Sequence, residues 1–156
     1  MKVRKTIRVY ADTSVFGGVF DEEFEHASKA FFEKIEAGRF VLVTSQLVRE
    51  EIFAAPDKVR RYFEKMLRFA EIADVSGEVL ELQSEYIKEG IVGRRYQTDA
   101  LHVALATVSK IDVIVSWNFK HIVNFQKIPL YNAVNKLNGY KEIGIYSPLE
   151  VIDYED

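Results

Sequence analysis

The sequence predicts an α/β fold in which helices cover both faces of a parallel β-sheet. Short apolar runs of strand length alternate along the chain with segments of helical periodicity, as in βαβ units. Two runs, 40–44 and 113–116, are almost wholly apolar, which is typical of strands buried on both faces of a parallel sheet. No repeat or linker interrupts the pattern, and 156 residues fit one domain, expected over 1–156.

In the first half of the chain, capping and breaking residues mark the ends of the helices. Asp12 follows the first apolar run, and Gly38 ends the first helix. Ser45 is placed to cap a helix, which Pro56 then stops. The predicted elements are strand 7–11, helix 25–37, strand 40–44, helix 46–54, helix 58–70 and a short strand 71–75.

The second half repeats this alternation. Ser76 opens a helix that Gly90 closes, and a loop over 91–97 follows. Thr98 is expected to cap the next helix, whose apolar residues recur at the spacing of one helical face. The predicted elements are helix 76–89, helix 99–109, strand 113–116, helix 129–137 and strand 143–146.

Composition excludes several classes of function. The absence of cysteine rules out disulfides, thiolate zinc sites and cysteine nucleophiles. A formal charge of −3 gives no broad basic surface for binding nucleic acid by charge alone. No apolar run approaches the roughly 20 residues that cross a bilayer. We therefore expect a cytoplasmic protein with no membrane segment.

Four polar side chains are predicted to meet at the carboxyl edge of the sheet. Asp12 and Asn118 follow strands, Glu51 lies in a helix that begins directly after a strand, and Asp99 opens another helix. Because sites in open α/β sheets form outside the carboxyl ends of the strands, these groups should converge. Oxygen ligands of this kind suit a divalent cation. A metal-dependent nuclease is the leading hypothesis.

Each of these residues also has a simpler interpretation. Asp12 can cap a following helix, Asp99 can complement a helix dipole, and Asn118 can be a turn residue. Glu51 falls on the apolar face of its helix, where a carboxylate needs a partner or a metal. Glu50 lies on a more polar face and is the second choice for this ligand.

Other charged residues are weaker candidates for binding substrate. Arg94 and Arg95 lie in the predicted loop, and Lys120 and His121 follow the fourth strand, so all four are assigned to phosphate contacts. For His121 a simple surface position is an equal alternative. His102 is three residues after Asp99 and can face the site, but packing near the core is the favoured interpretation.

Three further observations limit the alternatives. Asp112 precedes a strand at the opposite edge and is interpreted as structural, and core packing is favoured for Trp117. A phosphatase often has a second Asp two residues after its nucleophilic Asp, and here that place holds Ser14. No Gly-x-Gly-x-x-Gly follows the first strand, which disfavours a dinucleotide-binding enzyme.

Taken in order, these short motifs resemble those of PIN domains. The matching stretches begin at Asp12-Thr13-Ser14, Ser45, Thr98-Asp99-Ala100-Leu101-His102 and Val115-Ser116-Trp117-Asn118, and they span about residues 5–125. The resemblance implies a Rossmann-like three-layer α/β/α sandwich. It also implies an Mg²⁺- or Mn²⁺-dependent endoribonuclease, with acidic residues at the positions of Asp12, Glu51 and Asp99.

The resemblance extends to partners, with one departure at the site. In length the chain is similar to VapC-type toxins, which implies RNA as substrate, an antitoxin as partner and a homodimer or larger homo-oligomer. The family often has Asp where this chain has Asn118, so the site carries one negative charge fewer and should bind metal less tightly. The alternative is a non-catalytic PIN-like module that binds RNA or protein.

Overall fold

The fold is built on one five-stranded sheet in which every strand runs parallel to its neighbours. A computed structural model describes residues 5–154, so both ends of the predicted 1–156 domain lie outside the described residues. The strands are β1 (Ile7–Ala11), β2 (Phe40–Ser45), β3 (Ala70–Ala73), β4 (Val113–Val115) and β5 (Gly144–Tyr146). Their order across the sheet is β3-β2-β1-β4-β5.

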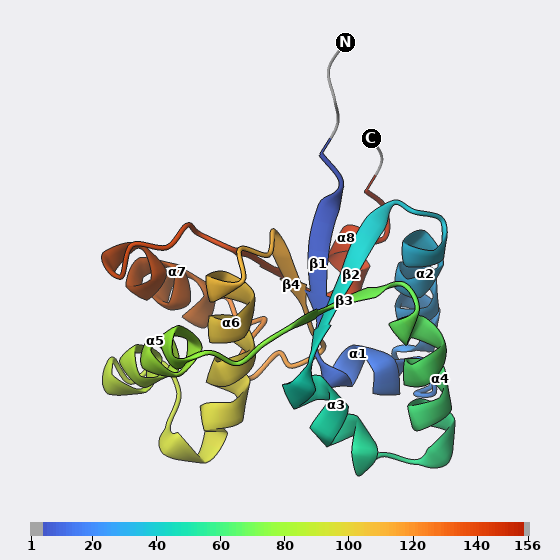
Figure 1. Ribbon diagram of the computed structural model, residues 1–156, viewed down its shortest axis with the longest axis horizontal. Helices are drawn as coiled ribbons and strands as arrows, with labels where there is room; N and C mark the ends of the chain where they lie inside the picture. Colours follow the sequence, from blue (N-terminus) through green and yellow to red (C-terminus); the bar gives the residue numbers. More distant parts are fainter. Residues whose placement is uncertain (1–4, 155–156) are drawn as a thin grey trace.

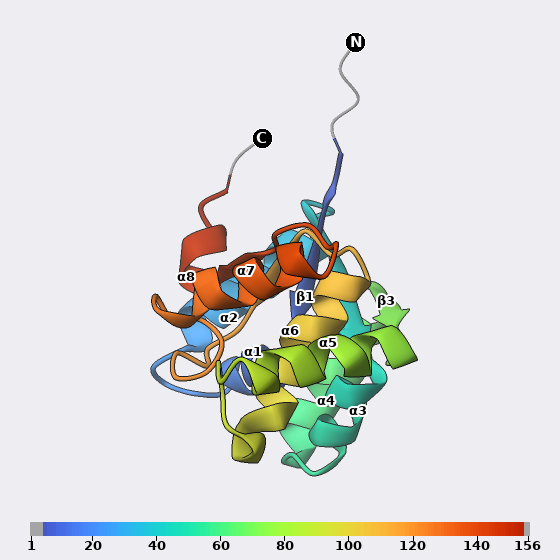
Figure 2. The same cartoon turned by 90° about the vertical axis from the view of Figure 1, so that its left-hand side faces the viewer.

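Helices lie on both faces of this sheet, which confirms the predicted α/β class. They are α1 (Thr13–Gly18), α2 (Glu25–Glu36), α3 (Gln46–Phe53), α4 (Asp57–Leu67), α5 (Gly77–Lys88), α6 (Gln97–Val108), α7 (Lys127–Leu137) and α8 (Pro148–Val151), with a 3₁₀ turn η1 (Arg94–Tyr96). Figure 1 shows α5, α6 and α7 on one face and α1, α2, α4 and α8 on the other, with α3 beyond the strand ends. Figure 2 faces the layer of α5, α6 and α7.

The central position of β1 determines where the site forms. Val9 pairs with Leu42 of β2 on one side and with Val113 of β4 on the other. The ladder continues one residue past the strand, because the Asp12 backbone N–H donates to the Val115 carbonyl at 3.2 Å. The chain therefore leaves β1 at the point where connections to the two halves of the sheet diverge, a position that favours a binding site.

Element boundaries differ from the predictions where local signals compete. α6 begins at Gln97 instead of Asp99, because the 3₁₀ turn η1 leads directly into it and Thr98 is not its cap. The short helices α1 and α8 were not among the predicted elements; both are too short for helical periodicity to reveal. Ser45 and Ser76 cap α3 and α5 as predicted, accepting from the backbone N–H three residues later.

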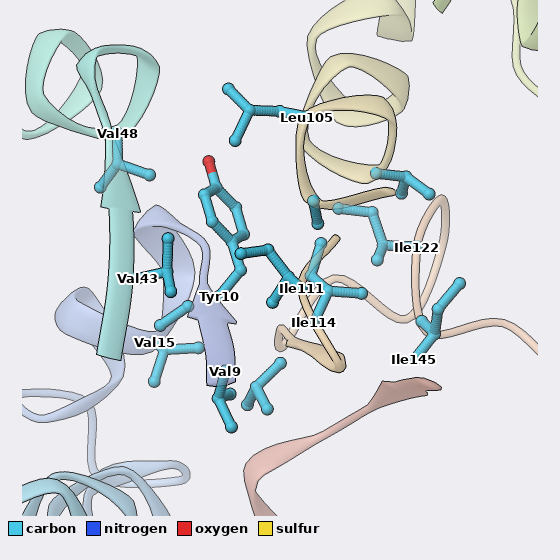
Figure 3. Packing of buried hydrophobic residues seen from close by; sticks show 14 of the residues in the cluster. Val9, Tyr10, Val15, Val43, Val48, Leu105, Ile111, Ile114, Ile122 and Ile145 are labelled. Carbon is cyan, nitrogen blue, oxygen red and sulfur yellow. The ribbon is translucent and has the colours of Figure 1, made fainter. Parts of the chain in front are cut away.

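The core is continuous across both layers and contains Tyr10 near its centre. Tyr10 and Ile114 are completely buried, as are Val43 and Val48 on the neighbouring strand and helix. Figure 3 shows the Tyr10 ring among these aliphatic side chains, with its hydroxyl directed between the helices that carry Val48 and Leu105. A phenol placed this deeply requires a hydrogen-bond partner, because an unpaired buried hydroxyl is costly.

Trp117 packs in the core, as its favoured interpretation predicted. Its ring stacks on Phe24 with the ring centroids 4.3 Å apart, and Nε1 donates to Ser28 Oγ at 2.8 Å. Gly18 lies against this contact: a Cβ added there would stand 2.8 Å from Trp117 Nε1 and 2.5 Å from Ser28 Oγ. In contrast, a Cβ added at Gly17 would meet nothing within 4 Å.

Asp112 has a structural role at the amino edge of the sheet, as predicted. Its carboxylate accepts from the Arg8 backbone N–H at 2.9 Å and from Lys5 Nζ at 3.2 Å. Among residues 5–154, no helix combines the length and the apolar character needed to cross a bilayer.

Candidate functional site

Asp12 stands at the carboxyl end of β1, where two serine side chains hold both oxygens of its carboxylate. Oδ1 accepts from the Ser14 backbone N–H at 3.1 Å and from Ser14 Oγ at 2.5 Å. Oδ2 accepts from Ser116 Oγ at 2.6 Å. The same serines also accept from backbone N–H groups just after β4: Trp117 N–H donates to Ser14 Oγ, and Asn118 N–H donates to Ser116 Oγ, each at 2.9 Å. β1 and β4 are thus joined through one carboxylate.

The Asp12 carboxylate is poorly compensated despite these bonds. The residue is only 5% exposed, and burial raises its pKa above the usual range, against the lowering effects of His102 and the two serines. The nearby Glu51 carboxylate raises the pKa further. A cation at this point would relieve both the desolvation and the repulsion between the two carboxylates. Asp12 also caps α1, so its simpler interpretation and a ligand role are compatible.

Glu51 faces Asp12 from α3, while its neighbour Glu50 is exposed to solvent. Glu51 Oε1 accepts from Thr13 Oγ1 at 3.1 Å and pairs with His102 Nε2 at 2.6 Å. Burial acts to raise the pKa of Glu51, but the hydrogen bond and charge of His102, with the bond from Thr13, outweigh it and bring the pKa below its ordinary value. The structure therefore places Glu51, and not Glu50, beside Asp12.

His102 is buried, as its favoured interpretation predicted, but it also reaches the site. It is 2% exposed, and its Nδ1 lies 2.8 Å from the Tyr10 hydroxyl, which in turn lies 2.8 Å from Ser45 Oγ. This chain of hydrogen bonds connects β2, β1 and α6 to Glu51 on α3. The sequence signal for it was the position of His102 one helical turn after Asp99, which cannot identify a partner 51 residues away.

Asp99 lies in the first turn of α6 and is half-buried. Within residues 5–154 its carboxylate accepts no hydrogen bond, and its charge acts on His121 and Tyr131 instead of Asp12. Asp99 is therefore a free carboxylate at the edge of the site, outside the Asp12–Glu51 pair.

Asn118 and His121 form a turn after β4. Asn118 Oδ1 accepts from the His121 backbone N–H at 2.9 Å, so the amide oxygen has the turn role that was its simpler interpretation. The His121 ring stacks on Tyr96 with centroids 3.8 Å apart, and both ring nitrogens are buried without a hydrogen-bond partner among the described residues. Burial lowers the pKa of His121. This imidazole cannot touch a phosphate in the observed conformation.

Three cations lie in η1 and in this turn. Arg95 and Lys120 lie 5.7 and 5.8 Å from the Tyr96 ring centroid, and Arg94 lines a groove of about 460 Å³ between α5 and the start of α6. All three are exposed, and none takes part in an ion pair among residues 5–154. They are the predicted phosphate contacts that remain accessible.

The carboxylates form a pair and not a closed cage. In the part of the chain that the structure describes, no three acidic or histidine side chains are close enough together to hold an ion. The donor chemistry nevertheless suits Mg²⁺, which commonly binds one or two carboxylates and keeps several waters. Asp12 and Glu51 are the two carboxylates available for this, and burial together with the charge of Glu51 raises the pKa of Asp12.

Comparison with known proteins agrees with this architecture. Among solved structures, the chain is similar to VapBC2 from Rickettsia felis bound to a DNA fragment from their promoter (TM-score 0.56, 14% identity, 90% of this chain and 98% of that chain covered). It is also similar to FitAcB from Neisseria gonorrhoeae (TM-score 0.58, 11% identity, 92% and 99% covered). A third is Mycobacterium tuberculosis VapC20, a sarcin–ricin-loop cleaving toxin (TM-score 0.55, 14% identity, 87% and 98% covered).

These identities are low, so the similarities establish the fold alone. No curated protein matches the sequence significantly. The family model of the PIN domain, however, matches residues 9–121, which include the end of β1, the Asp12–Glu51 pair and the turn after β4. On this match, which covers well over half of its length, the chain belongs to the PIN domain family.

Proposed function

We propose that the protein is an Mg²⁺- or Mn²⁺-dependent endoribonuclease. The observation that supports this most directly is the buried Asp12 carboxylate beside Glu51, at the carboxyl edge of a PIN-domain sheet. A buried carboxylate near a second carboxylate is costly unless a cation or a proton offsets the charge. Retaining such a pair at the family's site position is expected if a metal ion completes it.

Asp12 and Glu51 would hold the ion, and Asp99 would act through a bound water. Asp99 can accept a hydrogen bond from a metal-bound water at the edge of the site, since no described residue donates a hydrogen bond to its carboxylate or forms an ion pair with it. Asn118 would act indirectly, because its oxygen already accepts from the His121 backbone. When bound, a divalent ion supplies Lewis acidity and lowers the pKa of a coordinated water.

The protein's own residues would hold the Asp12 carboxylate and the RNA phosphates in place. Ser14 and Ser116 fix both oxygens of Asp12, so this carboxylate cannot rotate away when the substrate arrives. Arg94, Arg95 and Lys120 would bind the phosphates that flank the scissile bond, because they are exposed and form no ion pair with the described residues 5–154. The negative site repels RNA without metal, so metal and RNA should bind cooperatively.

We further propose that this nuclease is the toxin of a toxin–antitoxin pair. Support comes from the similar structures: one is a toxin–antitoxin complex from Klebsiella pneumoniae, and VapC20 is a toxin that cleaves the sarcin–ricin loop. The partners would be a cognate antitoxin and a second copy of the chain, in the cytoplasm. Light scattering of the purified protein, alone and with the product of an adjacent gene, tests both partners.

A non-catalytic module is the second candidate function. It is favoured by the turn role of Asn118 and by the lack of a three-ligand cluster among residues 5–154. Such a module would bind RNA through Arg94, Arg95 and Lys120 without hydrolysing it.

One experiment separates the two functions. A mixed RNA pool is incubated with the purified protein, with and without Mn²⁺, and the cleaved ends are mapped. We expect cleavage that requires Mn²⁺ and is lost in Glu51→Gln, while Glu50→Gln, an exposed neighbour on the same helix, serves as matched control and retains it. RNA binding without cleavage in the parent protein indicates the binding module, and full activity of Glu51→Gln refutes the proposed site.

A further inference from the structure

His102 connects the hydrophobic core to one oxygen of Glu51. Its ring is almost completely buried, with Nδ1 on the Tyr10 hydroxyl and Nε2 on Glu51 Oε1. The Tyr10 hydroxyl is itself held by Ser45 Oγ, whose position is fixed because it caps α3. Figure 3 shows the Tyr10 hydroxyl at the end of the core that lies toward α3 and α6.

The partners of His102 determine which nitrogen must carry a hydrogen. A carboxylate oxygen only accepts, so the 2.6 Å contact with Glu51 requires a hydrogen on His102 Nε2. The Tyr10 hydroxyl can donate or accept, so it can form a hydrogen bond with Nδ1 whether or not Nδ1 carries a hydrogen. The network thus permits one orientation of the imidazole, with its Nε2–H directed at Glu51.

This arrangement leaves the two oxygens of Glu51 unequal. Oε1 receives two hydrogen bonds, from Thr13 Oγ1 and from His102 Nε2. Among the described residues nothing donates to Oε2. A glutamate on a helix otherwise samples many rotamers, but with Oε1 held by two donors the carboxylate plane is fixed and Oε2 is left for an external ligand.

We propose that His102 is a positioning residue that holds Glu51 so that Oε2 is presented to the metal. This inference rests on the proposed function, because it assumes that Glu51 is a metal ligand. A histidine needed only for packing would find its hydrogen-bond partners inside the core, whereas His102 donates its Nε2–H to a carboxylate at the site that is about one-third exposed. The anchor through Tyr10 and Ser45 ties that carboxylate to the two central strands.

Mn²⁺ binding to the full chain, measured by electron paramagnetic resonance without RNA, tests the proposal. His102→Leu removes the donor, and we expect its Kd for Mn²⁺ to rise about 10- to 100-fold, the usual effect of losing a hydrogen bond to a metal ligand. His102→Gln is the conservative rescue, because its amide N–H can replace Nε2–H; its Kd should stay within about threefold of the parent value. In a Glu51→Gln background, His102→Leu should cause no further loss.

The outcomes distinguish failure of the inference from failure of the function. If the parent protein does not bind Mn²⁺, the proposed function fails and the inference falls with it. If the parent binds Mn²⁺ and His102→Leu binds it equally well or more tightly, only the inference is overturned.

A measurement on the unmodified chain covers the case in which His102→Leu does not fold. Long-range ¹H–¹⁵N spectra should show a hydrogen on His102 Nε2 in the metal-free protein. Its resonance should shift during Mg²⁺ titration with the same Kd as metal binding. An Nε2 without hydrogen, or a resonance that ignores saturating Mg²⁺, overturns the proposal.

Discussion

Removing the Ser116 hydroxyl should destabilise the protein more than any other single-atom change at the site. Ser116 is completely buried, and its Oγ is the only described donor to Asp12 Oδ2. The same oxygen accepts from the Asn118 backbone N–H at 2.9 Å. Ser116→Ala therefore leaves one carboxylate oxygen and one backbone N–H without partners.

The magnitude follows from these two losses. A hydrogen bond to a charged group contributes about 1.5–3 kcal/mol, and an orphaned buried donor costs about 1–3 kcal/mol. Taking the lower part of each range, because water can enter beside Asn118, gives about 3–4 kcal/mol. For a chain of this size each kcal/mol lowers the thermal midpoint by about 2–4 °C, so a shift of roughly 6–16 °C is expected.

Ser14→Ala is the matched comparison, because Ser14 has the same two roles. Its Oγ donates to Asp12 Oδ1 and accepts from a backbone N–H at 2.9 Å. Asp12 Oδ1, however, keeps its bond from the Ser14 backbone N–H, which the substitution does not remove. Ser14 is also only half-buried. We expect Ser14→Ala to cost about half as much as Ser116→Ala, or about 1.5–2 kcal/mol.

Urea unfolding in EDTA at two pH values provides the assay. Burial raises the pKa of Asp12, and loss of the Ser116 bond removes one of the effects that lower it. The part of the penalty that comes from Asp12 belongs to its ionised carboxylate, whereas the loss at the Asn118 N–H does not depend on pH. The total cost should therefore be largest at neutral pH and shrink as pH falls toward the raised pKa of Asp12. The reasoning is refuted if Ser116→Ala costs no more than Ser14→Ala, or if its cost is the same at acidic and neutral pH.

The remaining predictions concern stability and RNA binding. Asp12→Asn should stabilise the metal-free protein at neutral pH, because a carboxyl group whose pKa is raised in the folded state lowers the free energy of unfolding as pH rises above its unfolded pKa. This gain should vanish in acid. Urea titrations at several pH values measure it, and a loss of stability at neutral pH would contradict the prediction. Gly18→Ala should cost about 1–3 kcal/mol in thermal unfolding through its clash with the tryptophan, whereas Gly17→Ala, with open space, should cost nothing; equal midpoints would disprove the contact. Removing both Arg95 and Lys120 should weaken RNA binding and reduce the slope of log K against log salt by about 1.4, since each phosphate contact on a single strand contributes about 0.7; an unchanged slope would exclude them as phosphate contacts.

The sequence was informative where a single element carries its own signal. Apolar runs located the five strands, and because parallel strands end at one edge, the convergence of Asp12 and Glu51 could be predicted without coordinates. Helical periodicity also separated Glu51 from Glu50. Strand order could not be predicted, because nothing local distinguishes β2 from β4 as the neighbour of β1.

The rest of the site depends on contacts between distant segments. The serine pair around Asp12 joins residues 104 positions apart, and isolated serines after strands are common turn residues. The bond between His102 and Glu51 depends on how α6 and α3 lie at the sheet edge. The early start of α6 reflects a 3₁₀ turn, which places Asp99 within the first turn and not at its first residue.

The strand order has a consequence for how the site comes into being. Residues before the exposed stretch around Val75 build β1, β2 and β3 and contribute Asp12 and Glu51, whereas residues after it build β4 and β5 and contribute Ser116 and His102. A cut at Val75 would separate Asp12 from Ser116 and Glu51 from His102, so neither fragment could assemble the complete site by itself. Pairing of β1 with β4 would bring two such fragments together and restore the site, so this scaffold is suited to split-protein complementation, with the proposed nuclease activity as the signal of reassembly.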